Sequence, residues 1–308
     1  MGRGDLTDAE WERSRPFLPV SNGRCGRWRD HRQVIDGILY RVRTGVHWRD
    51  LPGRFGPWKT VYERHRRWSA DGTWERLLQR VQAEADATGG IDWDISVDST
   101  VVRAHQHAAG ARSDPPPVVS GGRGGRTPER DAVMVLYRPP GGGGTGGESL
   151  GRSRGGLTTK VHLSADGRCR PLSLIVTPGQ RADCTQFEAV LEKIRVPRPG
   201  PGRPKKKPDS VAADKAYSNG LCRAYLRRRG IRHAIPEKTD SRAARLRKGA
   251  RGGRPPGFDE ERYKKRNTVE RAINRLKNFR AAATRYDKRA YVFLGTVTAA
   301  AWAIWLRT

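Results

Sequence analysis

Three acidic residues of the chain are spaced so that they could form a centre for phosphodiester chemistry. Asp98 ends a predicted strand, Asp214 ends a later one, and Glu270 lies on a predicted helix. Phosphodiester cleavage places charge on the attacking and the leaving oxygen, and two divalent ions held by shared carboxylates stabilise both. The hypothesis for this set is a site for two Mg²⁺ ions, in which Mn²⁺ can substitute. Each carboxylate alone is a weak indication, because an Asp on a strand is usually a surface or capping residue.

The predicted helix over residues 260–280 carries further polar side chains beside the third carboxylate. Tyr263, Arg266, Glu270 and Lys277 fall within about 60° of one another on such a helix. A carboxylate flanked by cations that bind phosphate suits a centre that cuts DNA. By spacing alone, a solvated stripe with ordinary ion pairs explains the pattern equally well. The separate apolar face of the helix consists of Val269, Ala272, Ile273 and Leu276.

The charge of the chain indicates a polyanionic partner. The 308 residues include 61 Lys and Arg but only 32 Asp and Glu, which gives a net charge of +29. Such an excess repels itself unless a polyanion neutralises it, so nucleic acid is the expected partner. A genome bias toward Arg explains the preference for Arg over Lys but leaves the deficit of acidic residues unexplained.

Other classes of protein fit the composition less well. No basic amphipathic helix suits a membrane surface, and the most apolar stretch, 291–306, is too short to span a bilayer comfortably. The four cysteines are scattered, so neither a zinc knuckle nor a disulfide framework is expected. The amino-terminal residues form no apolar signal segment. We therefore expect a cytoplasmic protein that associates with the nucleoid and has no membrane partner.

Residues 1–88 are predicted to form a helical DNA-binding domain. Helical periodicity follows Asp30 and ends at Gly45, and a third short helix is predicted over residues 58–69. Short helices joined by tight turns, the last of them basic, are typical of a helix-turn-helix module. Arg64, Arg66 and Arg67 are the candidate DNA contacts of that basic helix. An ordinary helical bundle with a solvated basic face remains the alternative.

Residues 89–308 are predicted to form an α/β catalytic domain with a mixed sheet. Strands are expected at 91–98, 158–164, 170–177, 209–214 and 231–235, separated by helices, one of them capped by Asp183. Residues 241–258 are expected to be an Arg- and Gly-rich loop. A Gly- and Pro-rich stretch at about 109–156 is predicted to be a flexible insertion within this domain, because strand signals resume directly after it.

Three motifs resemble those of bacterial insertion-sequence transposases of the DDE type. The segment from Tyr263 to Lys277, with Arg266 and Glu270 at its conserved spacing, resembles the signature around the last acidic residue of that family. The stretches that begin at Asp98 and at Ala213 resemble its first and second acidic motifs. The nearest likeness is to the insertion-sequence-five family, whose DNA-binding region resembles residues 48–58. The resemblance covers nearly the whole chain outside the Gly-rich stretch.

This resemblance implies a ribonuclease-H-like catalytic fold with flanking helices behind a helix-turn-helix-like domain. It implies that Asp98, Asp214 and Glu270 are the catalytic and metal-binding residues. Tyr263, Arg266 and Lys277 are then expected to contact the DNA end. The implied activity is the binding of the terminal inverted repeats of a mobile element, followed by metal-dependent strand cleavage and strand transfer into target DNA. A homodimer on double-stranded DNA is the expected assembly.

Two other functions stay open. A catalytically inactive DNA-binding protein, either a decayed transposase or a regulator, would share the charge but would not need three carboxylates within reach of shared metal ions. A structural RNA-binding protein is favoured by charge alone, and the aromatic strand motifs typical of such modules are not found in the sequence.

Overall fold

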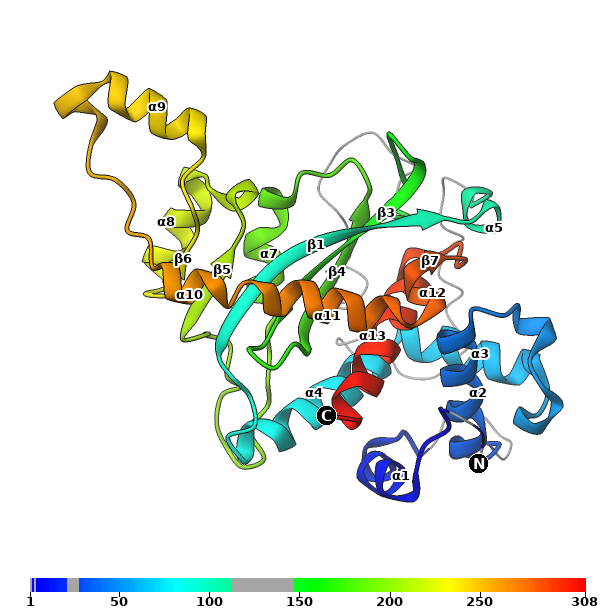
Figure 1. Ribbon diagram of the computed structural model, residues 1–308. Helices are drawn as coiled ribbons and strands as arrows, with labels where there is room; N and C mark the ends of the chain where they lie inside the picture. Colours follow the sequence, from blue (N-terminus) through cyan, green and yellow to red (C-terminus); the bar gives the residue numbers. More distant parts are fainter. Residues whose placement is uncertain (1, 3, 21–27, 112–146) are drawn as a thin grey trace, which may run out of the picture.

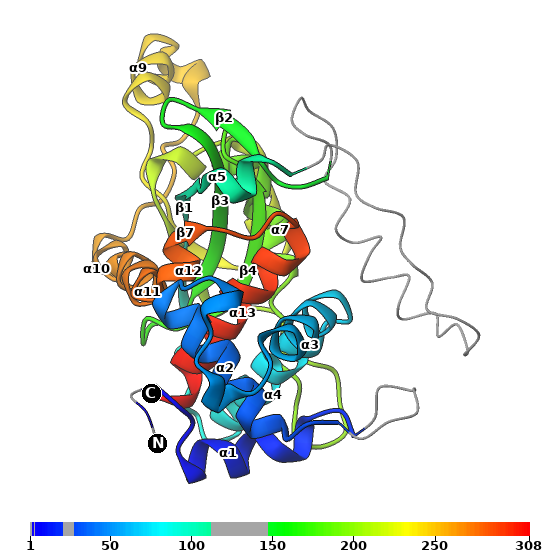
Figure 2. The same cartoon turned by 90° about the vertical axis from the view of Figure 1, so that its right-hand side faces the viewer.

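A mixed β-sheet with helices on both faces forms the body of the protein, as Figure 1 shows. The computed structural model describes residues 2, 4–20, 28–111 and 147–308. The predicted flexible insertion at 109–156 falls mainly on residues 112–146, which lie outside the described residues. Helices α11 and α13 cover one face of the sheet, and α7 and α8 cover the other (Figures 1 and 2).

The sheet combines antiparallel and parallel pairing, which confirms the predicted mixed α/β class. Strand β1 pairs antiparallel with β3 and parallel with β5, and β5 continues parallel to β6, while β4 lies on the outer side of β3. The predicted first strand, 91–98, is longer than expected and continues to Ala104. The strands are β1 (Asp94–Ala104), β2 (Gly151–Ser153), β3 (Gly156–Ala165), β4 (Pro171–Pro178), β5 (Ser210–Ala213), β6 (Arg232–Ala234) and β7 (Thr284–Arg285).

The amino-terminal helices begin and end where local signals place them. The Asp30 side chain accepts hydrogen bonds from the backbone N–H groups of Arg32 and Gln33, which caps α2. Gly45 ends that helix in the left-handed conformation, with φ of 72°, which favours glycine. The helices of this part are α1 (Asp8–Ser14), η1 (Arg15–Phe17), α2 (His31–Thr44), η2 (Trp48–Asp50), η3 (Gly53–Phe55), α3 (Trp58–Ala70) and α4 (Thr73–Ala87).

These amino-terminal helices share a hydrophobic core with the last helix, α13 (Ala290–Leu306). Trp74 contacts both Trp68 and Trp302, with ring centroids 5.3 and 5.8 Å apart, and all three side chains are buried. The buried His65 ring also bonds to Thr296 of α13 at 3.0 Å. The predicted domain boundary at residue 88 is therefore crossed by a hydrophobic core that residues from both sides share. Within the described residues no helix meets the length and hydropathy needed to cross a membrane.

The helices of the second half differ from the prediction at two points. The predicted single helix over 260–280 is broken, because the N–H groups of Lys265 and Arg266 bond to carbonyls three residues back instead of four. The expected loop 241–258 contains helical turns. These helices are α5 (Gln106–Ala109), η4 (Asp183–Gln186), α7 (Phe187–Glu192), η5 (Lys215–Tyr217), α8 (Gly220–Arg228), α9 (Thr239–Arg247), η6 (Gly249–Gly252), α10 (Glu260–Lys264), α11 (Asn267–Lys277) and α12 (Arg280–Ala283).

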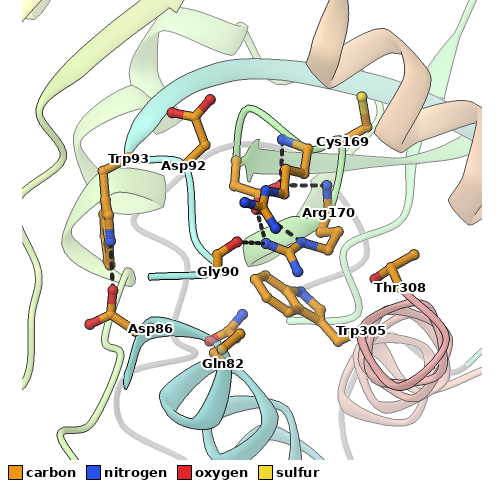
Figure 3. Close-up of polar contacts among 12 residues, drawn as sticks. Gln82, Asp86, Gly90, Asp92, Trp93, Cys169, Arg170, Trp305 and Thr308 are labelled. Carbon is orange, nitrogen blue, oxygen red and sulfur yellow. Dashed lines mark hydrogen bonds and ion pairs between the residues drawn. The ribbon is translucent and has the colours of Figure 1, made fainter. Parts of the chain in front are cut away.

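A buried ion pair ties the β3–β4 turn to the helices beneath it (Figure 3). Arg170 Nε donates to Asp166 Oδ2 at 2.9 Å, and its Nη2 donates to the carbonyl of Gly90 at 2.6 Å. The guanidinium carbon of Arg170 lies 3.8 Å from the centroid of the Trp305 ring, and Gln82 of α4 donates to two backbone carbonyls of the adjoining strand. One arginine thus connects the sheet, the start of β1 and α13.

Candidate active site

Asp98 and Asp214 lie on adjacent strands of the sheet, Asp98 within β1 and Asp214 directly after β5. Val97 of β1 is paired with Ala213 of β5 in parallel register. Asp98 directly follows Val97, and Asp214 directly follows Ala213. The Asp98 carboxylate accepts a hydrogen bond from the backbone N–H of Ser99 at 2.8 Å. The Asp214 carboxylate accepts from the N–H of Ala216, also at 2.8 Å. The structure thus places the first two acids on adjacent strands.

The electrostatics of Asp98 show that the three acids lie near one another. Burial raises its pKa to about 6, and the charges of Asp214 and Glu270 raise it further, against the hydrogen bond from Ser99 and the charge of Arg266. Burial is the largest cause of the raised pKa, and a bound cation would favour the ionised form of Asp98. Carboxylate oxygens are the donors that hard divalent cations prefer. Asp98 and Asp214 therefore offer oxygen ligands that suit a divalent metal ion.

Glu270 lies close by on α11, but its carboxylate is engaged elsewhere. Helix α11 packs on β1, where the Thr268 hydroxyl bonds to that of Ser96 at 3.1 Å. Arg266 Nη2 donates a hydrogen bond to Glu270 Oε1, one helical turn away. Among the residues that the structure describes, no group of three or more His, Cys, Asp and Glu side chains is placed to hold a metal ion. The structure thus brings two of the three acids together and keeps the third paired with an arginine.

The other residues of the predicted helical stripe do not share one helix. Tyr263 lies on α10, Arg266 caps α11, and the exposed Lys277 ends α11. The prediction of one continuous helix is therefore wrong, because tighter turns at residues 265 and 266 end α10 before α11 begins. Arg266 still bridges the two parts, since its guanidinium carbon lies 5.9 Å from the centroid of the Tyr263 ring.

Two residues beside the site were not singled out as functional. Asp183 was expected to cap a helix, but its carboxylate instead accepts from the Ser99 hydroxyl at 2.6 Å and from Lys160 Nζ at 2.9 Å. The Tyr217 hydroxyl is buried and has no hydrogen-bond partner among the described residues. Burial raises the pKa of Tyr217, as do the charges of Asp98, Asp183 and Asp214. Only Tyr217 had a signal in the sequence, its place three residues after Asp214.

The basic side chains of α3 divide into one interior arginine and two outer ones. Arg64 is only 8% exposed, with its guanidinium carbon 3.9 Å from the centroid of the Trp28 ring and its Nη1 2.9 Å from His31 Nδ1. Burial lowers the pKa of Arg64 to about 10. Arg66 is exposed and pairs with Glu63, and Arg67 is half-buried. The assignment of Arg64 as a DNA contact is therefore corrected, because its charge is enclosed by aromatic rings.

Family comparisons agree with this arrangement of the chain. A family model described as "Transposase DDE domain" matches residues 90–306, and one described as "Putative transposase of IS4/5 family" matches residues 6–78. No solved structure matches the chain.

Curated bacterial relatives match part of the chain. An uncharacterized protein, y4sN, of Sinorhizobium fredii is 40% identical over 124 residues, which cover 40% of this chain and 89% of the relative. An uncharacterized 16.2 kDa protein of insertion element IS402 from Burkholderia cepacia is 35% identical over 112 residues, or 34% of this chain and 76% of the relative. A putative transposase for insertion sequence element IS6501 from Brucella ovis is 30% identical over 151 residues, which cover 49% of this chain and all of the relative.

Proposed function

The chain belongs to the DDE transposase family, and we propose that it cuts and rejoins DNA at the ends of a mobile element with Asp98, Asp214 and Glu270 as metal ligands. Membership of the family makes the chain a transposase with a ribonuclease-H-like fold, an enzyme that binds DNA and uses divalent metal ions. The observation that carries the finer proposal is the pair of acids on adjacent strands, Asp98 within β1 and Asp214 directly after β5, with Glu270 on the helix that packs against β1.

The three acids would together hold the divalent ions in the proposed site. Divalent ions bound there, Mg²⁺ or Mn²⁺, would stabilise charge on the attacking and the leaving oxygen of the scissile phosphate. The backbone N–H groups of Ser99 and Ala216 orient Asp98 and Asp214 before a ligand arrives. Glu270 would complete the ligand set in place of its ion pair with Arg266. The guanidinium of Arg266 would then be free to bind a DNA phosphate, together with Tyr263 and Lys277.

The proposed reaction has two phosphoryl-transfer steps. Water attacks the phosphodiester at the element end, which breaks the bond to the 3′ oxygen and leaves a 3′-hydroxyl. That hydroxyl then attacks a phosphodiester of the target DNA. Its oxygen forms a bond to the target phosphorus, and the bond from that phosphorus to the 3′ oxygen of the target strand breaks. Because one phosphodiester replaces another, no further energy source is needed. We propose that two copies of the chain act together on the two terminal inverted repeats, on DNA of the nucleoid.

A catalytically inactive DNA-binding protein is the competing candidate. The ion pair between Arg266 and Glu270 favours it, because a carboxylate held by an arginine is not free to bind metal. The two candidates share the basic surface and differ in whether the carboxylates are needed for more than folding.

Metal binding by this site should depend on pH through Asp98. Because the pKa of Asp98 is raised from 3.8 to about 6, ionisation of Asp98 lowers the folding stability as pH rises between these two values, and the loss stays constant above pH 6 until a cation binds and offsets it. At pH 5 only about a tenth of Asp98 is ionised. Mg²⁺ should therefore raise the thermal unfolding midpoint more at pH 7.5 than at pH 5, as measured by calorimetry with and without the ion.

The matched variants make this test specific. Asp98→Asn should remove most of the stabilisation by Mg²⁺ at pH 7.5, whereas Glu12→Gln on the exposed face of α1 should leave it unchanged. Equal stabilisation by Mg²⁺ at the two pH values would contradict the assignment of Asp98 as a ligand.

DNA binding by α3 should depend on its outer arginines. The double variant Arg66→Ala, Arg67→Ala is expected to weaken duplex binding. The slope of log K against log [salt] should also become less steep by up to about 2, because each phosphate contact contributes about 0.9 to it. Fluorescence anisotropy over a salt series measures both quantities.

Arg64→Ala is the control for the double variant, because Arg64 lies on the same helix but faces inward. It is expected to lower the stability of the protein, since its guanidinium fills the space between Trp28 and His31, while the salt slope of the folded protein stays as in the wild type. A reduced salt slope for Arg64→Ala with a normal slope for the double variant would reverse this assignment of the helix faces.

A further inference from the structure

A basic arm, residues 236–258, extends from the body of the protein between β6 and α10. It contains α9 and η6 and lies at one end of the molecule, with α1 to α4 at the other end in both views (Figures 1 and 2). No residue of the arm is buried, and the side chain of Leu246 is 61% exposed. A helix of nine residues is only marginally stable without packing. The arm therefore lacks the packing that normally holds such a helix in place.

The charges of the arm identify the chemistry of a partner. The arm has seven basic side chains and two acidic ones, Glu237 and Asp240. Glu237 is already paired with Arg245 at 3.0 Å. The other basic side chains have no ion pair within the described residues; they are Lys238, Arg242, Arg247, Lys248, Arg251 and Arg254. An exposed row of cations of this kind matches a phosphate backbone.

The composition of the arm supplies many partners for phosphates and lacks the usual partners of adenine. The arm contains no Asn, Gln or His, and its one aromatic residue is Phe258. Asn and Gln are the usual partners of adenine edges in the major groove. The Phe258 ring packs on Tyr263, with centroids 5.2 Å apart, so the base of the arm is fixed beside the proposed DNA-end contacts.

A groove continues this basic surface from the arm to the sheet. The groove has a volume of about 520 Å³ and lies between β6 and α10. Its lining includes Arg227, Arg232 and Arg262 together with Phe258 of the arm. Three arginines therefore lie along the groove, and one of them, Arg262, is paired with Asp259 of the same lining.

The positions of the two basic regions relative to the acids suggest which DNA each would hold. The strands β1 and β5 and helix α11, which carry the three acids, lie between α3 and the arm (Figures 1 and 2). The amino-terminal helices and the arm thus lie on opposite sides of the elements that carry the acids. We propose that the basic arm binds the phosphate backbone of the DNA beyond the cleavage point, on the side away from the terminal repeat. This inference rests on the proposed function, in which the amino-terminal helices bind the repeat.

The test compares two duplexes and two matched variants. One duplex ends at the terminal repeat of the element that encodes the chain, and the other continues for about 20 base pairs beyond it, long enough to leave many phosphates for the arm. The arm variant is Arg242→Gln, Arg247→Gln, Arg251→Gln. The control variant is Arg195→Gln, Arg198→Gln, Arg203→Gln, which removes the same charge from an exposed loop before the start of β5, at the sheet edge opposite the acids.

The wild type and the control variant are expected to bind the longer duplex about tenfold or more tightly than the shorter one in 100 mM salt. The arm variant should bind the shorter duplex as the wild type does and gain nothing from the longer one. Its salt slope on the longer duplex should be lower by up to about 3. Thermal unfolding of the arm variant should match the wild type, because none of the three side chains is buried.

Four outcomes would overturn the inference, three of them for the arm variant. The arm variant could keep the full gain from the longer duplex, lose affinity equally on both duplexes, or lose no more than the control variant does. A wild type that gains nothing from the added base pairs would overturn it as well. Failure of the proposed function itself is distinct, because the wild type would then bind the terminal repeat no more tightly than an unrelated duplex of equal length.

Discussion

Asp98→Asn, Asp214→Asn and Glu270→Gln are each expected to reduce DNA strand cleavage on the order of 10³-fold or more while DNA binding is retained. Each substitution keeps the shape of the side chain and removes the charge that a divalent cation needs from its ligand. Binding is expected to be equal or slightly tighter, because the neutral side chain no longer repels the phosphates.

Cleavage of an end-labelled duplex in Mg²⁺ or Mn²⁺, and binding to the same duplex without metal, measure the two effects. Asp209→Asn is the matched control, since this exposed carboxylate lies at the start of β5, whereas Asp214 follows its end. Cleavage by the wild type that survives all three substitutions would contradict the assignment of the acids. A wild type that binds the repeat and never cuts it would support the inactive DNA-binding protein instead.

Arg170→Ala is expected to lower the free energy of unfolding by about 3–5 kcal/mol. Its partner Asp166 is fully buried, and Arg170 itself is only 4% exposed, so the variant leaves an unpaired carboxylate in the interior. The variant also loses the hydrogen bond to the Gly90 carbonyl and the stacking on Trp305 (Figure 3). Urea unfolding followed by far-ultraviolet circular dichroism measures the loss.

Arg168→Ala is the control for this prediction, because Arg168 lies in the same turn and is exposed. Its effect should stay within about 0.5 kcal/mol. The double variant Asp166→Asn, Arg170→Gln should lose less than the sum of the single losses, since no buried charge is left without a partner. A loss of less than about 1 kcal/mol for Arg170→Ala would show that the β3–β4 turn is not held by this ion pair.

Features of the fold that depend on neighbouring residues were predictable from the sequence. The ends of α2 follow from the capping side chain of Asp30 and from Gly45, both of which act within one turn of the helix. The strand at residue 98 follows from the alternation of apolar and polar side chains, and the sequence of strands and helices indicated a mixed sheet. The adjacent placement of Asp98 and Asp214 followed from the family's motifs.

Features that depend on residues far apart in the chain were not predictable in this way. Asp183 meets Ser99 across 84 positions, and the burial of Arg64 depends on Trp28 from another segment. The break between α10 and α11 leaves the helical periodicity of the sequence unchanged, because a tighter turn of one or two residues hardly shifts the apolar face. The shared core of α13 and the amino-terminal helices was equally hidden, since a boundary in composition does not show which apolar faces pack together.

Anomalous X-ray diffraction from crystals of the protein grown with MnCl₂ and the terminal-repeat duplex tests the central claim most directly. The assignment predicts manganese peaks in contact with the carboxylates of both Asp98 and Asp214, with Glu270 turned from Arg266 to ligate one of the ions. Manganese bound elsewhere, or a Glu270 carboxylate still paired with Arg266 beside an ordered DNA end, would contradict it.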